Sequence, residues 1–143
     1  MTLVDALQRT LEAEHAAVYV YGVLGARTSA SATPGLFAAV EDAYAAHRDR
    51  RDQLTAFLLD EGAAPVAAAP AYSLPRAVTA DAVVAAAREL ERSAAETYAW
   101  LVAHTVERRR RWALEALTDA AVRVVTFRGS PEIFPGAGEH ADR

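Results

Sequence analysis

Two glutamates lie in the middle of apolar helical stripes, where a carboxylate is not expected. Glu14 interrupts a stripe between residues 3 and 21, and Glu91 interrupts one between residues 84 and 101. The apolar residues of both stripes recur at three- and four-residue intervals, which places their side chains on one face of an α-helix. A buried carboxylate without a partner costs several kcal/mol, so each glutamate needs a metal ion, a cation or a proton. The identity of that partner determines the chemistry of the molecule.

The two stripes share a local sequence pattern. In each, the glutamate is followed by an alanine three residues later and by a tyrosine seven residues later, giving Glu14-x-x-Ala17-x-x-x-Tyr21 and Glu91-x-x-Ala94-x-x-x-Tyr98. Alanine is abundant in this chain, but tyrosine occurs only 5 times in 143 residues, so the tyrosines make the repeat specific. The pattern predicts two equivalent helices that direct a carboxylate toward the middle of the molecule.

Four helical segments must position these side chains. The apolar spacing and the helix breakers predict helices over residues 2–27, 36–61, 79–104 and 107–128. Thr2 and Asp5 are a capping pair for the first helix, and Thr79 is the expected N-cap of the third. Gly62 should end the second helix, and Gly129 with Pro131 should end the fourth.

The segment 62–78, between the second and third helices, contains prolines at 65, 70 and 75. In a polyproline-like conformation it reaches roughly 53 Å, and the preceding helix is roughly 39 Å long. The segment can therefore cross the full length of a bundle, and Tyr72 and Leu74 should dock it there. We expect an all-α four-helix bundle of two antiparallel hairpins over residues 1–131, with an irregular tail over 132–143.

The composition excludes several classes of protein. The formal net charge is −4, which gives no general attraction to nucleic acid or to anionic membranes. The absence of cysteine excludes disulfides, thiolate metal sites and thiol catalysis. No basic leader and no membrane-length apolar run is present, so we expect a cytoplasmic protein. The run Arg108 to Arg111 opens a helix without interleaved aromatics, which indicates a solvated face or a contact with acidic partners.

The arrangement resembles the ferritin-like superfamily: two hairpins, a long crossover, and an inward glutamate on the first and third helices. The Glu-x-x-Ala-x-x-x-Tyr pattern is similar to the first- and third-helix signatures of rubrerythrin-type members. Over nearly its full length the chain also resembles an uncharacterised actinobacterial ferritin-like domain family, through the segments Ala-Glu-His-Ala-Ala-Val-Tyr at 13–19, Ala-His-Arg at 46–48, Pro-Ala-Tyr-Ser-Leu-Pro at 70–75 and Leu-Thr-Asp-Ala-Ala-Val-Arg at 117–123. This resemblance implies the fold but brings no established activity.

The ferritin-like resemblance implies a six-ligand di-metal site, with one glutamate from each of two helices and Glu-x-x-His from each of the others. Glu14 and Glu91 match the single glutamates. In the second helix His47 matches the histidine, but Tyr44 stands where the glutamate should be. The fourth helix offers no ligand in register, since the matching positions are Thr118 and Ala121, or Leu117 and Ala120. The site is therefore incomplete for two metal ions.

Two interpretations of these residues stay open. In the first, a single iron or manganese ion binds both glutamates and His47, with Tyr44 as a fourth ligand. In the second, the residues are the remnant of a metal site, and the carboxylates are satisfied by a histidine or by the nearby arginines Arg51 and Arg123. His15 adjoins the first glutamate but points off the stripe, so we expect it to be exposed.

We expect a non-catalytic binding or scaffold protein with a vestigial metal site and no cofactor. The alternative is a carboxylate-bridged iron or manganese oxidoreductase, and a third possibility is a small-molecule pocket in the former metal cavity. Tyr19, Trp100 and Trp112 are candidates for an outward aromatic cluster, which would suggest a homodimer. The expected partner is therefore a protein or a small molecule, without nucleic acid or membrane.

Overall fold

The computed structural model describes residues 1–137. Within that range it contains four helices and no strands: α1 (Leu3–Ala26), α2 (Pro34–Asp60), α3 (Ala80–Ala103) and α4 (Glu107–Thr126). This confirms the predicted all-α four-helix bundle. No helix lies between residues 127 and 137, and the rest of the expected tail, 138–143, is outside the described residues.

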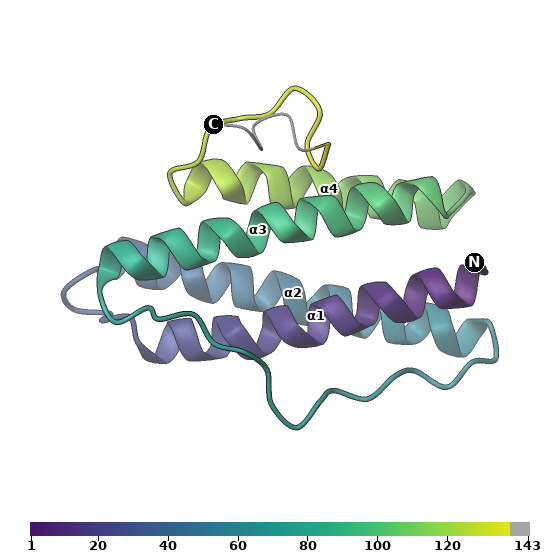
Figure 1. The fold of residues 1–143 in the computed structure, drawn as a ribbon, viewed down its shortest axis with the longest axis horizontal. Coiled ribbons are helices and arrows are strands. Elements are labelled where there is room, and N and C mark those ends of the chain that lie inside the picture. The colour runs from purple at the N-terminus through teal and green to yellow at the C-terminus, as the bar shows by residue number, and fades with distance from the viewer. Residues whose placement is uncertain (138–143) are drawn as a thin grey trace.

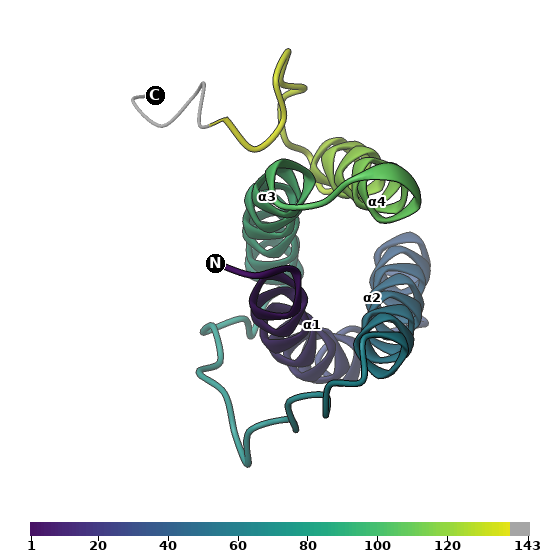
Figure 2. The same ribbon diagram turned by 90° about the vertical axis from the view of Figure 1, so that its right-hand side faces the viewer.

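The helices form two antiparallel hairpins, as predicted. α1 and α2 make one hairpin, α3 and α4 make the other, and the connection from α2 to α3 runs along the whole bundle (Figure 1). Seen from one end, the helices form a ring in which α1 lies beside α3, and α4 lies across from α1 (Figure 2). α1 and α3 are therefore antiparallel neighbours from different hairpins, and this pairing positions the two glutamate stripes.

The helix ends follow from the capping residues. The Asp5 N–H donates to Thr2 Oγ1 at 3.1 Å and the Thr2 N–H donates to Asp5 Oδ2 at 2.8 Å, which is the predicted capping box. Thr79 accepts from the Ala82 N–H at 3.1 Å, as expected of the α3 N-cap. Gly62 follows α2 with φ of +72°, a conformation that favours glycine.

α4 ends two residues earlier than predicted, at Thr126 instead of residue 128. Phe127 turns into the core, where it is only 1% exposed, and Arg128 takes a left-handed φ of 62°. The Gly129 N–H then returns to the Val124 carbonyl at 2.7 Å. A Cβ at this glycine would lie 2.4 Å from Val124 Cγ1, so glycine is required for the closing turn.

The crossover is attached to α1 by hydrogen bonds. The Gln8 amide donates to the Ala64 carbonyl at 2.7 Å and accepts from the Val66 N–H at 2.8 Å. His15 Nε2 lies 3.0 Å from the Val66 carbonyl oxygen. The expectation that His15 is an exposed residue was therefore wrong: it is half-buried because the crossover covers it.

The two predicted docking residues of the crossover behave differently. The Tyr72 ring packs against Tyr19, with ring centroids 5.4 Å apart, whereas Leu74 stays 40% exposed. Trp100 lies under the Arg9 guanidinium, and Trp112 packs inward on Phe57. The aromatic residues considered for an outward cluster thus contact separate parts of the bundle.

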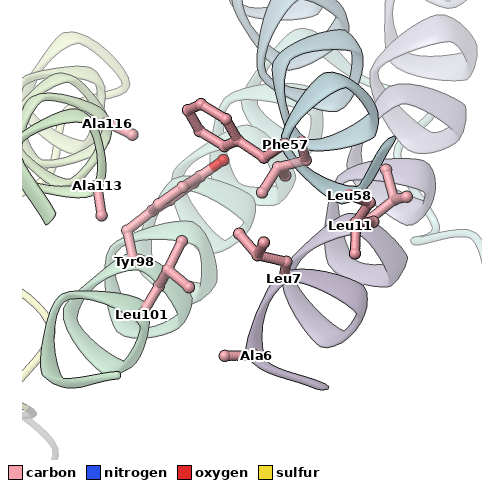
Figure 3. Packing of buried hydrophobic residues seen from close by; sticks show 10 residues of the cluster. Ala6, Leu7, Leu11, Phe57, Leu58, Tyr98, Leu101, Ala113 and Ala116 are labelled. Atoms are coloured by element: carbon pink, nitrogen blue, oxygen red, sulfur yellow. The ribbon is translucent and has the colours of Figure 1, made fainter. Parts of the chain in front are cut away.

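Two apolar clusters fill the interior on either side of a polar layer. One cluster brings together side chains from all four helices: Ala6, Leu7, Leu11, Leu54, Phe57, Leu58, Tyr98, Leu101, Ala113 and Ala116. In Figure 3, Leu7 and Tyr98 point into the space between their helices. The other cluster contains Val20, Tyr21, Leu24, Val40, Ala43, Ala77, Val83, Val84, Ala87 and Phe127. Each fully buried leucine contributes about 1.5–3 kcal/mol. In the described chain no helix is long and apolar enough to cross a membrane.

Candidate functional site: a buried polar centre

Five polar side chains from three helices form one hydrogen-bonded chain between the apolar clusters. We call this group the polar centre; its members are Glu14, Tyr21, His47, Glu91 and Tyr98. Glu14 is 2% exposed and the other four are at most 1% exposed. The polar centre is therefore closed to bulk solvent, so bulk water does not satisfy its charges.

The two tyrosines bind the two glutamates reciprocally. Tyr98 of α3 donates to Glu14 Oε1 of α1 at 2.6 Å, and Tyr21 of α1 donates to Glu91 Oε1 of α3 at 2.6 Å. In each helix the tyrosine lies two turns after the glutamate, on the same face. Because α1 and α3 run in opposite directions, each carboxylate faces the tyrosine of the other helix. The sequence repeat thus produces a symmetric pair of hydrogen bonds.

His47 of α2 joins the two halves of the polar centre. Its Nδ1 lies 2.6 Å from Glu14 Oε2, and its Nε2 lies 3.1 Å from Glu91 Oε1. Burial lowers the pKa of His47, but the charges and hydrogen bonds of the two glutamates outweigh burial and raise it to about 9. At neutral pH the ring is therefore an imidazolium, and both ring N–H groups donate to carboxylates.

Both tyrosines stay protonated. Burial, together with the negative charge and hydrogen bond of Glu91, raises the pKa of Tyr21 far above its usual value. Burial and the charge of Glu14 do the same for Tyr98. Each phenol is therefore a fixed donor, and the carboxylates are the acceptors. All four donor groups of the polar centre, the two phenols and both ring N–H groups of His47, are directed to the two glutamates.

Arg50 of α2 lies beside the polar centre and was not predicted. It is 7% exposed, its guanidinium lies 5.4 Å from the Tyr98 ring centroid, and its Nη2 pairs with Asp119 of α4. Its charge opposes the rise in the pKa of both Tyr21 and Tyr98. The sequence held one signal for it: Arg50 is three residues after His47, and so lies on the same helix face.

Two buried atoms near the polar centre have no hydrogen-bond partner in the described chain: Glu91 Oε2 and Arg50 Nη1. Buried polar atoms are nearly always paired, so these two mark the least satisfied part of the interior. Glu91 Oε2 is the one carboxylate oxygen of the polar centre that accepts no hydrogen bond.

The structure brings Glu14, His47 and Glu91 together but places the other candidate residues elsewhere. The buried stripe of α2 passes through Ala43 instead of Tyr44, which lies half-buried at its edge with the Arg48 guanidinium 5.5 Å from its ring centroid. Arg51 pairs with its neighbour Asp52 at 2.7 Å. The positions of these two side chains follow from a helix face that is rotated slightly from the one we expected.

Arg123 also does not bind either glutamate in the described contacts. Its guanidinium pairs with Asp42 at 2.8 Å and with Asp119 at 3.1 Å. Of the two kinds of partner expected for the buried carboxylates, the histidine binds them and the arginines do not, and two tyrosines supply the remaining hydrogen bonds. Tyrosine was part of the recognised repeat, but its role as donor depends on the antiparallel pairing of α1 and α3.

The donor set does not fit two metal ions. α4 directs only apolar side chains to the interior, namely Ala113, Ala116, Ala120 and Val124. The α4 carboxylate Asp119 is engaged by Arg50 and Arg123. Among the described residues no group of three or more carboxylate, histidine or cysteine side chains is arranged to hold a metal ion. In the described structure the members of the polar centre are hydrogen-bonded to one another.

Comparisons with known proteins give a family and a related structure but no activity. A family model described as "Domain of unknown function (DUF4439)" matches residues 6–139. A crystal structure of a conserved hypothetical protein, rv2844, from Mycobacterium tuberculosis is 32% identical in sequence with a TM-score of 0.78. The match covers 87% of this chain and 86% of that one. A search of curated proteins found no match.

Proposed function

The chain belongs to the DUF4439 family of domains of unknown function, and from this premise we propose that it is a non-catalytic binding or scaffold protein with a ferritin-like bundle. In this proposal the polar centre is a vestigial metal site that now fixes the packing of the two hairpins. We also propose that the protein is cytoplasmic and forms a homodimer.

One observation carries the proposal: His47 uses both ring nitrogens toward carboxylates, at 2.6 Å and 3.1 Å. A histidine binds a metal through a lone pair on a neutral ring, and an imidazolium has none. Three of the four carboxylate contacts in the polar centre are charge-assisted or phenolic hydrogen bonds shorter than 2.7 Å. Such bonds stabilise the buried charges without a metal ion.

The alternative function is an iron or manganese oxidoreductase with an incomplete site. The observation that favours it is Glu91 Oε2, a buried carboxylate oxygen without a hydrogen-bond partner among the described residues. Glu14, His47 and Glu91 would hold such an ion only after His47 loses its proton and the three side chains leave their present hydrogen bonds, because their described arrangement is not one that holds a metal ion. The ion would supply redox chemistry, and the apolar clusters on both sides would exclude water from it.

Metal analysis separates the two functions. We expect protein purified from medium supplemented with iron, manganese and zinc to contain far less than one metal ion per chain. Thermal unfolding should be the same with and without a chelator, because only a ligand that binds the folded state stabilises it. One ion per chain that is lost on Glu91→Gln, and is retained on Glu89→Gln at an exposed position of the same helix, would establish the oxidoreductase instead.

A further inference from the structure

A groove of ≈ 230 Å³ lies between α2 and the first half of α4, away from the polar centre's hydrogen bonds. Gln53 and Phe57 of α2 line one side, and Arg108, Arg111, Trp112 and Glu115 of α4 line the other. The groove therefore combines an aromatic surface with two guanidinium groups, an amide and one carboxylate. Elsewhere these two helices are joined by the ion pairs Arg50–Asp119 and Asp42–Arg123, whose charged groups bind each other.

The aromatic part of the groove is held rigidly. Trp112 packs edge-on against Phe57, with ring centroids 5.2 Å apart, and against Tyr98 at 5.7 Å. Phe57 and Tyr98 are buried, at 4% and 1% exposure, while Trp112 is half-buried. The indole thus presents one fixed apolar surface to the groove. A side chain that packs on it displaces water with little loss of protein side-chain entropy.

The four arginines at the start of α4 fall into two groups. Arg109 pairs with Glu61, and Arg110 donates to the Val102 carbonyl at 3.1 Å. Arg108 and Arg111, the two that line the groove, form no ion pair with any residue of the described chain. They are three residues apart, so their side chains leave the helix on the same side. Two guanidinium groups that have no ion-pair partner among residues 1–137 therefore border the Trp112 surface, and that of Arg108 lies 6.0 Å from the Phe57 ring centroid.

The charge pattern distinguishes between possible occupants. A guanidinium binds a carboxylate through two parallel hydrogen bonds, and two of them side by side favour an anion. Glu115 on the same groove repels a continuous polyanion such as nucleic acid, whereas it can accept from a peptide N–H. A short peptide with a carboxylate next to an apolar side chain satisfies all of these groups.

We propose that this groove binds an acidic segment of a partner protein, with an aspartate or glutamate between Arg108 and Arg111 and an adjacent apolar side chain on Trp112. The inference rests on the proposed binding function and specifies its partner. It follows a known mode of recognition in which clustered arginines read acidic motifs and an aromatic anchor adds apolar contact.

Two pools of short synthetic peptides test the proposal. The acidic pool carries aspartate and glutamate around one leucine or phenylalanine, and the amide pool replaces every carboxylate by asparagine or glutamine. Binding is followed by Trp112 fluorescence in a Trp100→Phe background. We expect the acidic pool to bind, the amide pool to bind at least tenfold more weakly, and the acidic-pool affinity to fall as salt is raised.

Variants localise the binding to the groove. Arg108→Glu and Arg111→Glu should each weaken acidic-pool binding at least tenfold, and Arg76→Glu, an equal charge change on the exposed crossover, should weaken it less than twofold. Gln53→Glu adds a charge to the groove without removing a contact, so it should also weaken binding. Equal loss in Arg76→Glu, equal binding of both pools, or tighter binding of a single-stranded oligonucleotide would each overturn the proposal. None of these results depends on the metal content, so the test is separate from that of the vestigial site.

Discussion

The tyrosine hydroxyls of the polar centre each satisfy a buried carboxylate. Removing one leaves a buried charged acceptor with one donor fewer, which costs about 1–3 kcal/mol. We therefore expect Tyr21→Phe and Tyr98→Phe to lower the free energy of unfolding by this amount in urea titrations. Tyr19→Phe changes the same group at a position that is 37% exposed and should change stability by less than about 0.5 kcal/mol. Equal stability of all three variants would contradict the assigned hydrogen bonds.

The raised pKa of His47 makes stability depend on pH. The pKa is about 9 in the folded chain against 6.5 for the unperturbed group, so the folded state binds the proton more tightly. This contribution is fully present below about pH 6.5 and is lost as the pH rises through 9. The unfolding free energy should fall by roughly 2–3 kcal/mol between pH 6 and pH 9.5, where the unfolded tyrosines have only begun to ionise and contribute little to the slope.

His47→Gln is the control for this pH dependence. The amide cannot take up a proton, so the slope of stability between pH 6 and pH 9.5 should largely disappear even though the variant is less stable throughout. A slope that persists in His47→Gln would assign the titration to a different group.

At the residue scale, the sequence predicted the buried carboxylates more completely than the side chains that surround them. Glu14 and Glu91 are visible because each interrupts an apolar stripe, and His47 because it continues the apolar face of its helix. Arg50 and Asp119 were not predicted, because each lies on a helix with many charged residues and neither position stands out from its neighbours in the sequence. Their pairing depends on the rotation and height of α2 against α4, which sequence spacing within one helix does not specify.

At the element scale, the ion pair between Arg50 and Asp119 links α2 of one hairpin to α4 of the other. Asp119 is 42% exposed, so solvent screens the pair and its coupling should be about 1 kcal/mol instead of the larger value of a fully buried pair. A double-mutant cycle with Arg50→Met and Asp119→Asn should measure this coupling. The same cycle on Arg51 and Asp52, a surface pair on one helix, should give nearly zero. If both cycles gave the same coupling energy, the Arg50–Asp119 pair would contribute no more than a surface ion pair does.

The helix boundaries were predictable where a side chain or glycine terminates the hydrogen-bond pattern locally. The capping box at Thr2 and the N-cap at Thr79 involve residues three apart, so they can be read from the sequence directly. The end of α4 was placed two residues late because Phe127 leaves the helix to fill the core. Tertiary packing determines this helix end, and the helix propensities of the local residues carry no information about it.

At the scale of the whole molecule, the two hairpins are joined covalently by the crossover but held together by the interior. Residues 67–71 of the crossover are exposed, while the polar centre and both apolar clusters include side chains from both hairpins. The long connection was predictable from its prolines and length. The pairing of α1 with α3 was not, and this pairing is what makes the tyrosine–glutamate bonds reciprocal.

Cutting the crossover tests whether the interior alone holds the hairpins together. With a protease site in place of residues 67–70, we expect the cleaved fragments to co-elute in gel filtration and to keep the helical circular dichroism signal. Melting should become dependent on concentration, with a loss of about 2–3 kcal/mol at tens of micromolar, because the linker supplied an effective concentration in the millimolar range.

Glu91→Ala should separate the cleaved hairpins, because it leaves His47 and Tyr21 without their shared acceptor, and Glu89→Ala should not. If the cleaved wild-type fragments separate, the crossover contributes more to the fold than a tether does.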